Sequence, residues 1–321
     1  MARAALEHAD IPVAYARQDL SLPIGRIREV VQYFKALETF PADLVRASDL
    51  ERVLTQAAGN QPLARNPWWS LLASCVQGWH DESGNAELPV RHAMDFLWEA
   101  LAEQKRERFM GRGVFLSTVH FAKGTEFDHV IVADGGWNPK PGEEEEQRRV
   151  YYVAMTRAKQ TLALIHRQDD PNPYVPVLEA QLSGEQLLAI AASGLTKCPD
   201  EVLRRRYEVI GMKGVYLDYA GCVVESHAVR RHLQSIETGS TLLFKPAGEK
   251  IEICDENGFP LTTLSNECRD KWASRLSHVE ELKVVAMVER RANDIKDPGF
   301  KKRLKIDAWE IPIVEVSYSN S

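Results

Sequence analysis

The sequence predicts an α/β protein in which a domain with a largely parallel sheet is followed by a small β-rich domain. Between residues 113 and 168, strand-like segments alternate with loops and one helix, an order typical of α/β domains. These strand-like segments are apolar and nearly continuous, as expected of strands that are covered on both faces. After about residue 205 the pattern changes to short strands separated by turns, which indicates a second core.

The composition is that of a packed, soluble protein. The 321 residues are 44% hydrophobic and 27% charged, and this length suits two or three domains. No apolar run approaches the ~20 residues of a membrane span. The first residues lack the apolar core of a signal peptide, so we expect a cytoplasmic protein that does not contact a membrane.

Charge and cysteine usage argue against a general DNA binder and against a cysteine-based metal site. The net charge of -6 argues against a histone-like, general DNA binder, although a DNA groove can be locally basic on an acidic body. The five cysteines are scattered without the spacing of a metal site, so we expect no metal ligands and reduced, mostly buried thiols.

The first part of the chain predicts a strand followed by helices. Residues 2–9 fit a helix end, and residues 11–15 fit a short strand. Apolar residues three and four apart predict a helix over residues 24–37. Residues 39–112 are more polar, and we expect them to form an inserted helical subdomain with helices near 43–58 and 90–108.

The clearest α/β pattern follows. We expect strands at residues 114–118, 129–133 and 161–166, with a helix over 143–158 between the second and third strands. The loop between the first two strands reads HFAKGTEF, and polar loops at strand ends are where ligands approach α/β sheets.

The last part of the chain predicts a linker and a small barrel. Residues 169–204 begin with a segment rich in Pro, Asp and Asn and should form a linker and a helix. Residues 205–321 should form the β-rich domain, with a hairpin turn at Asn257-Gly258. Apolar and polar residues alternate along its strands, which predicts a sheet with one face exposed to solvent. Trp272 and Trp309 are expected in its core.

Two segments resemble a known family. STVHFAKGTEFDHVIV at residues 117–132 and EEEEQRRVYYVAMTRAKQTLAL at 143–164 resemble the fifth and sixth motifs of superfamily 1 DNA helicases of the UvrD/Rep type. The resemblance implies that residues 1–38 and 113–168 form the second RecA-like motor lobe and that 39–112 contact duplex DNA. Residues 16–18 depart from the family, which usually has a Gly-Gly turn there.

The resemblance also implies roles at the nucleotide. Arg157 would be the catalytic arginine finger that reaches the γ-phosphate, since a guanidinium is always charged and binds phosphate in a fork. Glu126 would accept hydrogen bonds from the ribose, and Gly124 would allow a tight turn before it. Arg148 and Arg149 match a pair of family arginines, one of which would organise the cleft by ion pairing, and Arg149 is expected to bind ATP.

DNA is the partner that the resemblance implies, either single-stranded or partly duplex. Thr118 and His120 match family positions that contact the DNA backbone. Lys123 is grouped with them as a DNA-binding residue, and it could either contact a phosphate or form a structural pair. In the last domain, Lys301, Lys302 and Arg303 belong to a basic run that could supply auxiliary phosphate contacts. Residues 239–276 also resemble HIRAN-type barrels, and a Tudor- or SH3-like barrel that binds a protein partner fits the pattern too.

The parts that would hold most of the nucleotide do not occur in the sequence. There is no GxxxxGK[ST] phosphate loop and no acidic strand end for Mg²⁺. We therefore expect the C-terminal half of an ATP-dependent helicase that uses ATP and Mg²⁺, with the Mg²⁺ ligands in an N-terminal half on a longer chain or on another chain. The isolated chain should be inactive. The alternative is a non-enzymatic DNA- or protein-binding module derived from a helicase lobe.

Overall fold

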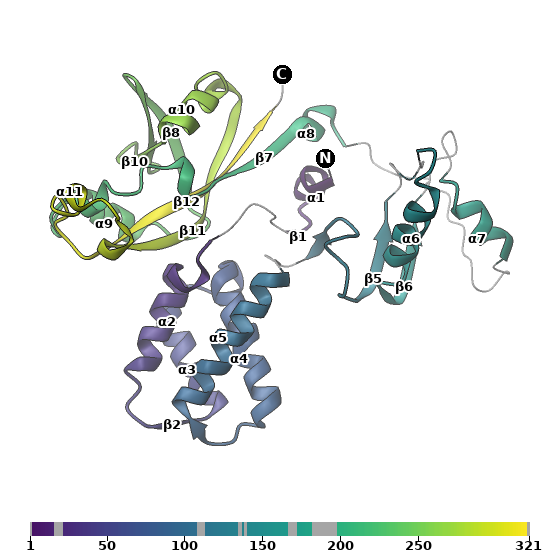
Figure 1. The fold of residues 1–321 in the computed structure, drawn as a ribbon, viewed down its shortest axis with the longest axis horizontal. Helices are drawn as coiled ribbons and strands as arrows, with labels where there is room; N and C mark the ends of the chain where they lie inside the picture. The colour runs from purple at the N-terminus through teal and green to yellow at the C-terminus, as the bar shows by residue number, and fades with distance from the viewer. Residues whose placement is uncertain are drawn as a thin grey trace. The chain divides into compact units, whose positions relative to one another are not determined.

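The chain divides into two compact units in the computed structural model. Unit 1 combines residues 1–12, 17–112 and 199–321, and unit 2 combines 13–16 and 113–198. Figure 1 shows the elements of both units. The structure describes residues 2–15, 22–107, 113–133, 137, 140–165, 172–181 and 198–319. Residues 16–18, where the sequence departs from the helicase family, lie outside these ranges, as does part of the expected linker.

Four helices form the first part of unit 1. The helices expected around residues 24–37, 43–58 and 90–108 are confirmed, and a fourth surrounds the Trp68-Trp69 pair. Asn66 caps this fourth helix, since its Oδ1 accepts a hydrogen bond of 2.9 Å from the Trp68 N–H. The bounds are α2 Arg28–Glu38, α3 Ala47–Ala58, α4 Pro67–Ser83 and α5 Val90–Glu107. Helix α3 starts later than expected because Leu44–Val45 form strand β2, which pairs with β3, Leu88–Pro89.

A six-stranded antiparallel sheet forms the second part of unit 1, in the order β10-β9-β8-β11-β12-β7. The expected hairpin turn is present, because Gly258 has a φ of 80° and joins two paired strands. The bounds are β7 Arg205–Ile210, β8 Thr241–Ala247, β9 Lys250–Cys254, β10 Pro260–Thr263, β11 Val279–Arg291 and β12 Ala308–Ser319. The accompanying helices are α8 Asp200–Arg204, α9 Ala228–Ser235, α10 Asn266–Ala273 and α11 Pro298–Lys301.

The segment after β7 covers the opposite edge of this sheet. Val215 forms a β-bridge with Leu264, and the Tyr216 N–H donates to the Thr263 carbonyl at 2.8 Å. The Thr262 hydroxyl donates to the Tyr216 carbonyl at 2.7 Å. These bonds satisfy backbone groups that an open edge would expose. The β-rich character is thus confirmed, while the barrel stays a prediction.

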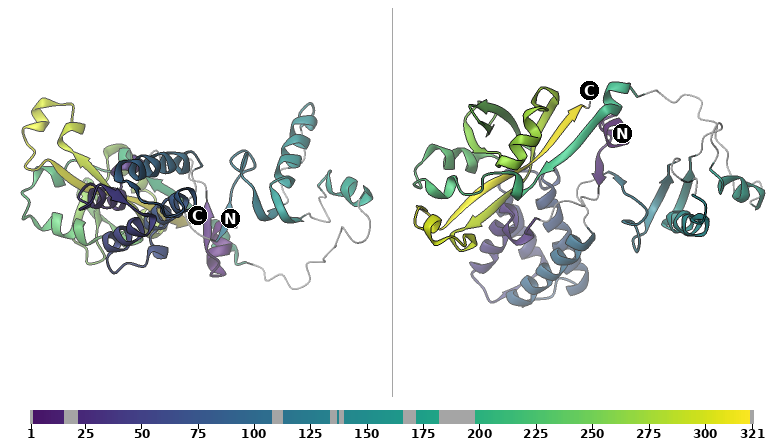
Figure 2. Two further views of the ribbon diagram at one scale, coloured as in Figure 1. Left: turned by 90° about the horizontal axis from the view of Figure 1, so that it is seen from below. Right: turned by 45° about the horizontal axis from the view of Figure 1, so that its top comes forward.

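The helices and the sheet of unit 1 share one hydrophobic core, whereas the sequence predicted separate domains here. The Trp68 indole N–H donates to the Val285 carbonyl of β11 at 2.8 Å, and Ile27 forms a bridge with Val288. Figure 2 shows α2–α5 beside this sheet from two further directions. Trp272 and Trp309 are 0% and 3% exposed, which confirms that they belong to the core.

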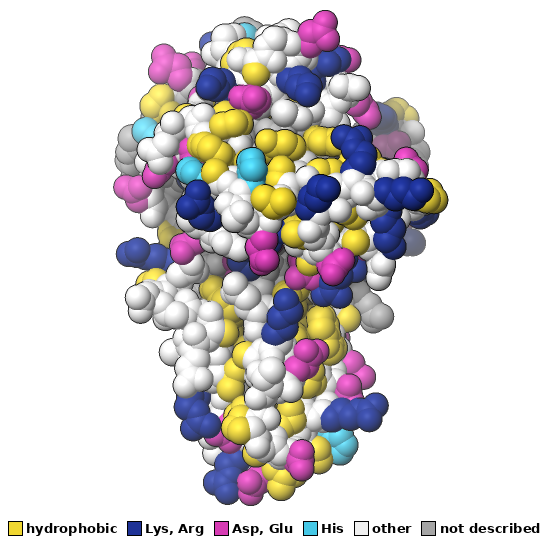
Figure 3. Space-filling model, turned by 90° about the vertical axis from the view of Figure 1, so that its left-hand side faces the viewer, with side chains coloured by type: hydrophobic (Ala, Val, Ile, Leu, Met, Phe, Trp, Pro, Cys, Tyr) yellow, Lys and Arg dark blue, Asp and Glu magenta, His cyan; other side chains and the backbone are white. Residues whose placement is uncertain are grey.

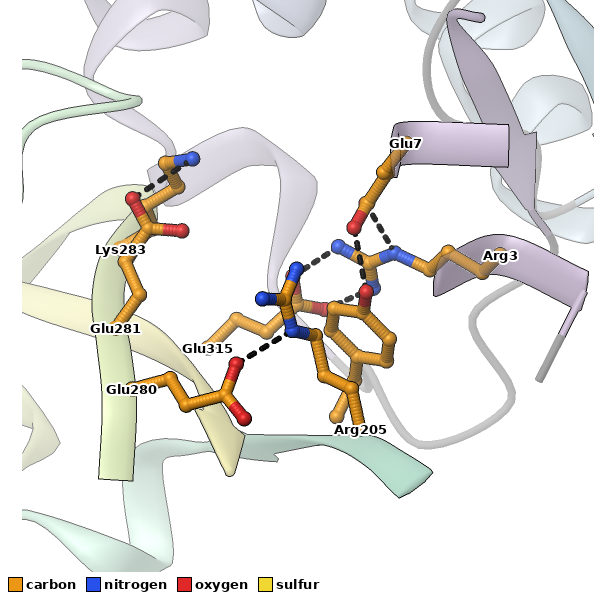
Figure 4. Close-up of polar contacts among 8 residues, drawn as sticks. Arg3, Glu7, Arg205, Glu280, Glu281, Lys283 and Glu315 are labelled. Carbon is orange, nitrogen blue, oxygen red and sulfur yellow. Dashed lines mark hydrogen bonds and ion pairs between the residues drawn. The ribbon is translucent and has the colours of Figure 1, made fainter. Parts of the chain in front are cut away.

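A polar network fixes the first helix to the same sheet. Helix α1, Ala2–His8, directs Arg3 between Glu7 at 2.7 Å and Glu315 of β12, also at 2.7 Å. The Arg3 guanidinium lies 3.7 Å from the ring centre of Tyr207 on β7, and Figure 4 shows Arg3 and Glu7 of α1 beside Glu315 of β12. Because Glu315 is 7% exposed, this ion pair is well shielded from solvent.

Unit 2 is the α/β part. Two parallel strand pairs are present: β1, Val13–Tyr15, with β4, Val114–Leu116, and β5, Phe127–Val132, with β6, Ala158–Leu164. The predicted parallel sheet is therefore confirmed. Helix α6, Glu144–Met155, covers β5 through Tyr151 and Ala154, which pack with Val132 and Val175 in a small core. Helix α7, Val175–Gln181, follows.

Candidate nucleotide and DNA site

The loop after β4 is held in a series of tight turns. The Thr118 carbonyl accepts hydrogen bonds of 3.1 Å from the N–H groups of Phe121 and Ala122. The Ala122 carbonyl accepts the Thr125 N–H at 3.2 Å and the Thr125 hydroxyl at 2.9 Å. Gly124 has a φ of 89°, a conformation that other residues adopt only with strain. The turn that the sequence predicted at Gly124 is therefore confirmed.

Arg157 joins the end of α6 to this loop. Its Nη1 donates to the Thr125 carbonyl at 3.1 Å, and its Nε donates to the Val153 carbonyl at 3.0 Å. Its Nη2 lies 3.2 Å from the Thr156 hydroxyl oxygen. In the opposite direction, the Phe127 N–H donates to the Arg157 carbonyl at 2.8 Å. Strand β6 consequently starts at Ala158, three residues before the predicted strand.

Glu126 follows Thr125, whose carbonyl accepts the hydrogen bond from Arg157. Its side chain is 58% exposed and lies 3.6 Å from the Nζ of Lys159. Sequence reasoning missed Lys159, although its position two residues after Arg157 and at the start of a strand parallel to β5 placed it near Glu126. The structure thus brings Arg157, Glu126 and Lys159 together.

Arg149 takes part in a different interaction. Its Nε lies 3.1 Å from Glu145 Oε1 on the same helix, and Arg148 contacts the other carboxylate oxygen at 2.7 Å. The hydrogen bond from Arg148 is the main cause that lowers the pKa of Glu145. Ion pairing was expected for this arginine pair, but the partner is on the surface of α6 itself, and no bond joins Arg149 to Arg157 or Glu126 among the described residues.

The three residues expected to contact DNA all follow β4. Thr118, His120 and Lys123 are exposed and lie on the same loop as Glu126. No ion pair involves Lys123 in the described part of the chain. Their side chains are thus open to solvent on the segment that Arg157 anchors.

The auxiliary basic residues belong to unit 1. Lys301 ends α11, and Lys302 and Arg303 follow it; all three are exposed. The Lys301 Nζ donates to Asn293 Oδ1 at 3.2 Å. The Arg303 guanidinium lies 5.0 Å from the ring centre of Phe300.

Arg157 and Glu126 carry groups of opposite charge at this site. Arg157 offers charge to a phosphate, and Glu126 offers acceptor oxygens to a sugar hydroxyl. Within the ranges that the structure describes, no group of three or more His, Cys, Asp or Glu side chains could hold a metal ion. No helix there is long and apolar enough to cross a bilayer.

Unit 2 thus combines parallel strands with an arginine after a helix and a carboxylate loop beside it. Residues 26–169 match the family model of the UvrD-like helicase C-terminal domain. The matched range includes both motif segments, so their predicted resemblance to the C-terminal region of UvrD-type helicases is confirmed. No curated protein and no solved structure gave a significant match.

Proposed function

We propose that this chain is the C-terminal half of an ATP-dependent DNA helicase and that unit 2 completes its ATPase cleft. The observation that carries the proposal is the 3.1 Å hydrogen bond from Arg157 to the Thr125 carbonyl. This bond links the helix that carries the arginine to the loop that carries Glu126. A movement of that loop would then change the position of the arginine, which a DNA-coupled ATPase requires.

Arg157 acts as the arginine finger in this proposal. Bound ATP with Mg²⁺ supplies the phosphoryl group that is transferred to water. The guanidinium stabilises the charge that develops on that group, while Glu126 orients the nucleotide through the ribose. Lys159 pairs with Glu126 when no nucleotide is bound.

Thr118, His120 and Lys123 form the DNA grip in this proposal. They lie on the loop whose end is fixed by Arg157. A single strand held by these residues would therefore be connected to the nucleotide through only a few backbone bonds. Lys301, Lys302 and Arg303 would add phosphate contacts from unit 1.

Exposed apolar side chains in unit 2 support a requirement for an N-terminal half. Ile131 is 66% exposed, Ile165 is 53% exposed and Leu162 is 40% exposed. Parallel strands are normally covered on both faces, and an uncovered apolar surface of this kind is typical of an interaction site. We propose that the nucleotide-binding half of the helicase covers it, whether on a longer chain or on a second one.

One observation favours the alternative, a non-enzymatic module derived from a helicase lobe. The Arg157 guanidinium already donates hydrogen bonds within the chain to the carbonyls of Val153 and Thr125. An arginine finger must exchange at least one of these bonds for a phosphate oxygen. A purely structural arginine would keep them in every state.

ATP hydrolysis separates the two functions. We expect negligible hydrolysis by the 321-residue chain alone, and DNA-stimulated hydrolysis after addition of an N-terminal half that carries a phosphate loop. DNA-stimulated turnover at helicase-like rates by the chain alone would contradict the proposed division of the site. Absence of turnover with every N-terminal half that binds the chain would favour the non-enzymatic module.

A further inference from the structure

Two loops of unit 1 lie side by side at one end of the C-terminal sheet. The first, residues 215–227, follows β7 and is here called the tyrosine loop. The second, residues 292–307, connects β11 to β12 and is called the basic loop. The Lys305 N–H donates to the Gly221 carbonyl at 2.9 Å, so the two loops are joined through their backbones.

The tyrosine loop is anchored to the core. A Cβ atom at Gly221 would lie 2.9 Å from the ring of buried Trp309, so only glycine allows the loop to approach so closely. The Trp309 indole N–H donates to the Leu217 carbonyl at 2.7 Å. Asp218 pairs with Arg290 at 2.7 Å. These contacts fix the loop in place before any ligand binds.

The basic loop carries positive charge that the protein does not neutralise. The basic loop contains five basic and three acidic residues. Two of the acids are engaged: Asp294 pairs with Arg26 at 3.3 Å, and Asp297 accepts the Gly299 N–H at 2.8 Å. Its five basic residues are exposed and have no ion pair within the described ranges, namely Lys296, Lys301, Lys302, Arg303 and Lys305.

The tyrosine loop adds exposed aromatic rings to this charge. Tyr216 is 40% exposed and Tyr219 is 38% exposed. Burial, Cys222 and Asp218 raise the pKa of the Tyr216 hydroxyl, while Arg303 lowers it. The hydrogen bond from the Lys305 N–H to the Gly221 carbonyl holds the tyrosine loop beside the basic loop. Figure 3 shows a face of the molecule on which Lys and Arg side chains lie around exposed hydrophobic side chains over the C-terminal sheet and its loops.

We propose that the tyrosine loop and the basic loop form a binding site for single-stranded nucleic acid, separate from the grip in unit 2. Unpaired bases present free faces that stack on Tyr216 and Tyr219, and the exposed cations bind the phosphates between them. A duplex keeps its bases stacked on one another and offers no such faces to the rings. The site therefore prefers an unpaired strand to a duplex of the same sequence.

Fluorescence anisotropy of the full chain with labelled oligothymidylate at several salt concentrations tests the site. Tyr216→Ala with Tyr219→Ala should weaken binding by about 10-fold or more, because each stacked base contributes about 1–3 kcal/mol, and should leave the salt dependence unchanged. Tyr216→Phe with Tyr219→Phe keeps both aromatic rings, so this variant should bind the oligonucleotide with the affinity of the unchanged chain. Circular dichroism verifies that each variant is folded.

Charge variants give the second measurement. Lys302→Gln with Lys305→Gln should weaken binding and reduce the slope of log K against log salt by about 1.4, since each single-strand phosphate contact contributes about 0.7. The matched control is Lys245→Gln with Lys250→Gln, which makes the same charge change at exposed positions on β8 and β9. An equal loss in the control, or unchanged affinity in the tyrosine variant, would overturn the site.

A further pair of variants separates this site from the proposed grip in unit 2. Thr118→Ala with Lys123→Ala should leave the tyrosine-dependent part of the affinity intact. If the Thr118→Ala/Lys123→Ala variant loses all binding and the tyrosine variant keeps its full affinity, the new site is rejected and the grip in unit 2 stands. If the unit 2 pair has no effect and the tyrosine variant does, the new site stands and the grip is rejected. Equal binding of duplex and single strand would also reject the new site.

Discussion

Glu126, the residue proposed to hold the ribose, is an exposed side chain. It is 58% exposed, and its charge is partly balanced by Lys159 at 3.6 Å. An exposed ion pair of this kind contributes little to stability, about 0–1 kcal/mol. The ion pair therefore leaves Glu126 available for the proposed ribose contact.

We expect Glu126→Ala to weaken nucleotide binding in the assembled helicase by about 10-fold, since a lost hydrogen bond to a charged acceptor costs about 1.5–3 kcal/mol. The rate of hydrolysis at saturating ATP should change little, because the ribose is distant from the transferred phosphoryl group. Titration with a fluorescent ATP analogue measures the first effect, and Lys159→Ala is the control for the loss of the ion pair alone. Unchanged nucleotide affinity would rule out the ribose contact.

Asp255 shows a titratable residue with a structural role. Its carboxylate is 7% exposed, accepts the Phe259 N–H at 2.8 Å and contacts His232 Nδ1 at 2.6 Å. Burial raises the pKa of Asp255, but the hydrogen bonds from Phe259, His232 and Asn257 outweigh it and hold the pKa below the ordinary value. The ionised form is therefore favoured in the folded state.

Because the pKa of Asp255 is lowered on folding, its ionised carboxylate stabilises the folded state, and this stabilisation depends on pH in the acid range. It should be fully present above the unfolded-state pKa of about 3.9 and be lost as pH falls through the lower folded-state pKa. Asp255→Asn should remove that part of the pH dependence between about pH 5 and 3. Urea unfolding at several pH values measures it, and an equally steep decline in the variant would contradict the role given to Asp255.

At the scale of elements, an irregularity in β11 explains a contact with the helices. The β11–β12 register shifts between Val284 and Ala286, which places the intervening Val285 in a bulge. A bulged residue loses ladder partners, and the Trp68 indole donates to the Val285 carbonyl at 2.8 Å. Helix α4 thus supplies the hydrogen bond that the sheet lacks.

Trp68→Phe should destabilise unit 1 by about 1–3 kcal/mol, because it leaves a buried carbonyl without a donor. Thermal unfolding followed by circular dichroism would show a lower midpoint. Trp98→Phe is the matched control, since Trp98 is 39% exposed and stacks on Phe34 at 4.0 Å between ring centres. An equal effect of the two substitutions would contradict the special role of the Trp68 hydrogen bond.

The elements themselves were largely predictable, but their partners were not. Apolar spacing predicted the helix of residues 24–37, and alternation with Asn257-Gly258 predicted the β9–β10 hairpin. Periodicity shows that one face of a helix is buried, yet it does not show which element covers that face. The bridge from Ile27 to Val288 joins residues far apart in the sequence, and no local pattern indicates it.

The candidate site was predictable for a different reason. Motif resemblance located Arg157, Glu126 and the loop of Thr118, and Gly124 has the left-handed φ that its place implied. Lys159 and the two exposed tyrosines were missed, because a lone lysine or tyrosine gives no pattern until the fold places it beside a partner.

At the scale of the whole molecule, unit 1 and unit 2 have different stability requirements. Unit 1 buries the aromatic side chains of Trp68, Trp272 and Trp309 in a continuous core. The core of unit 2 contains four buried residues among those described, and Ile131 remains 66% exposed. This contrast fits a stable body attached to a lobe that is completed by another half of the enzyme.

The central claim is tested most directly by Arg157→Ala in the complex of this chain with a nucleotide-binding helicase half. The rate of DNA-stimulated ATP hydrolysis should fall by about 10³-fold or more, with nucleotide affinity nearly unchanged, because an arginine finger acts mainly on the charge of the transition state. Arg157→Lys should restore little, since the fork geometry is lost. Near-normal turnover in the alanine variant would contradict the account.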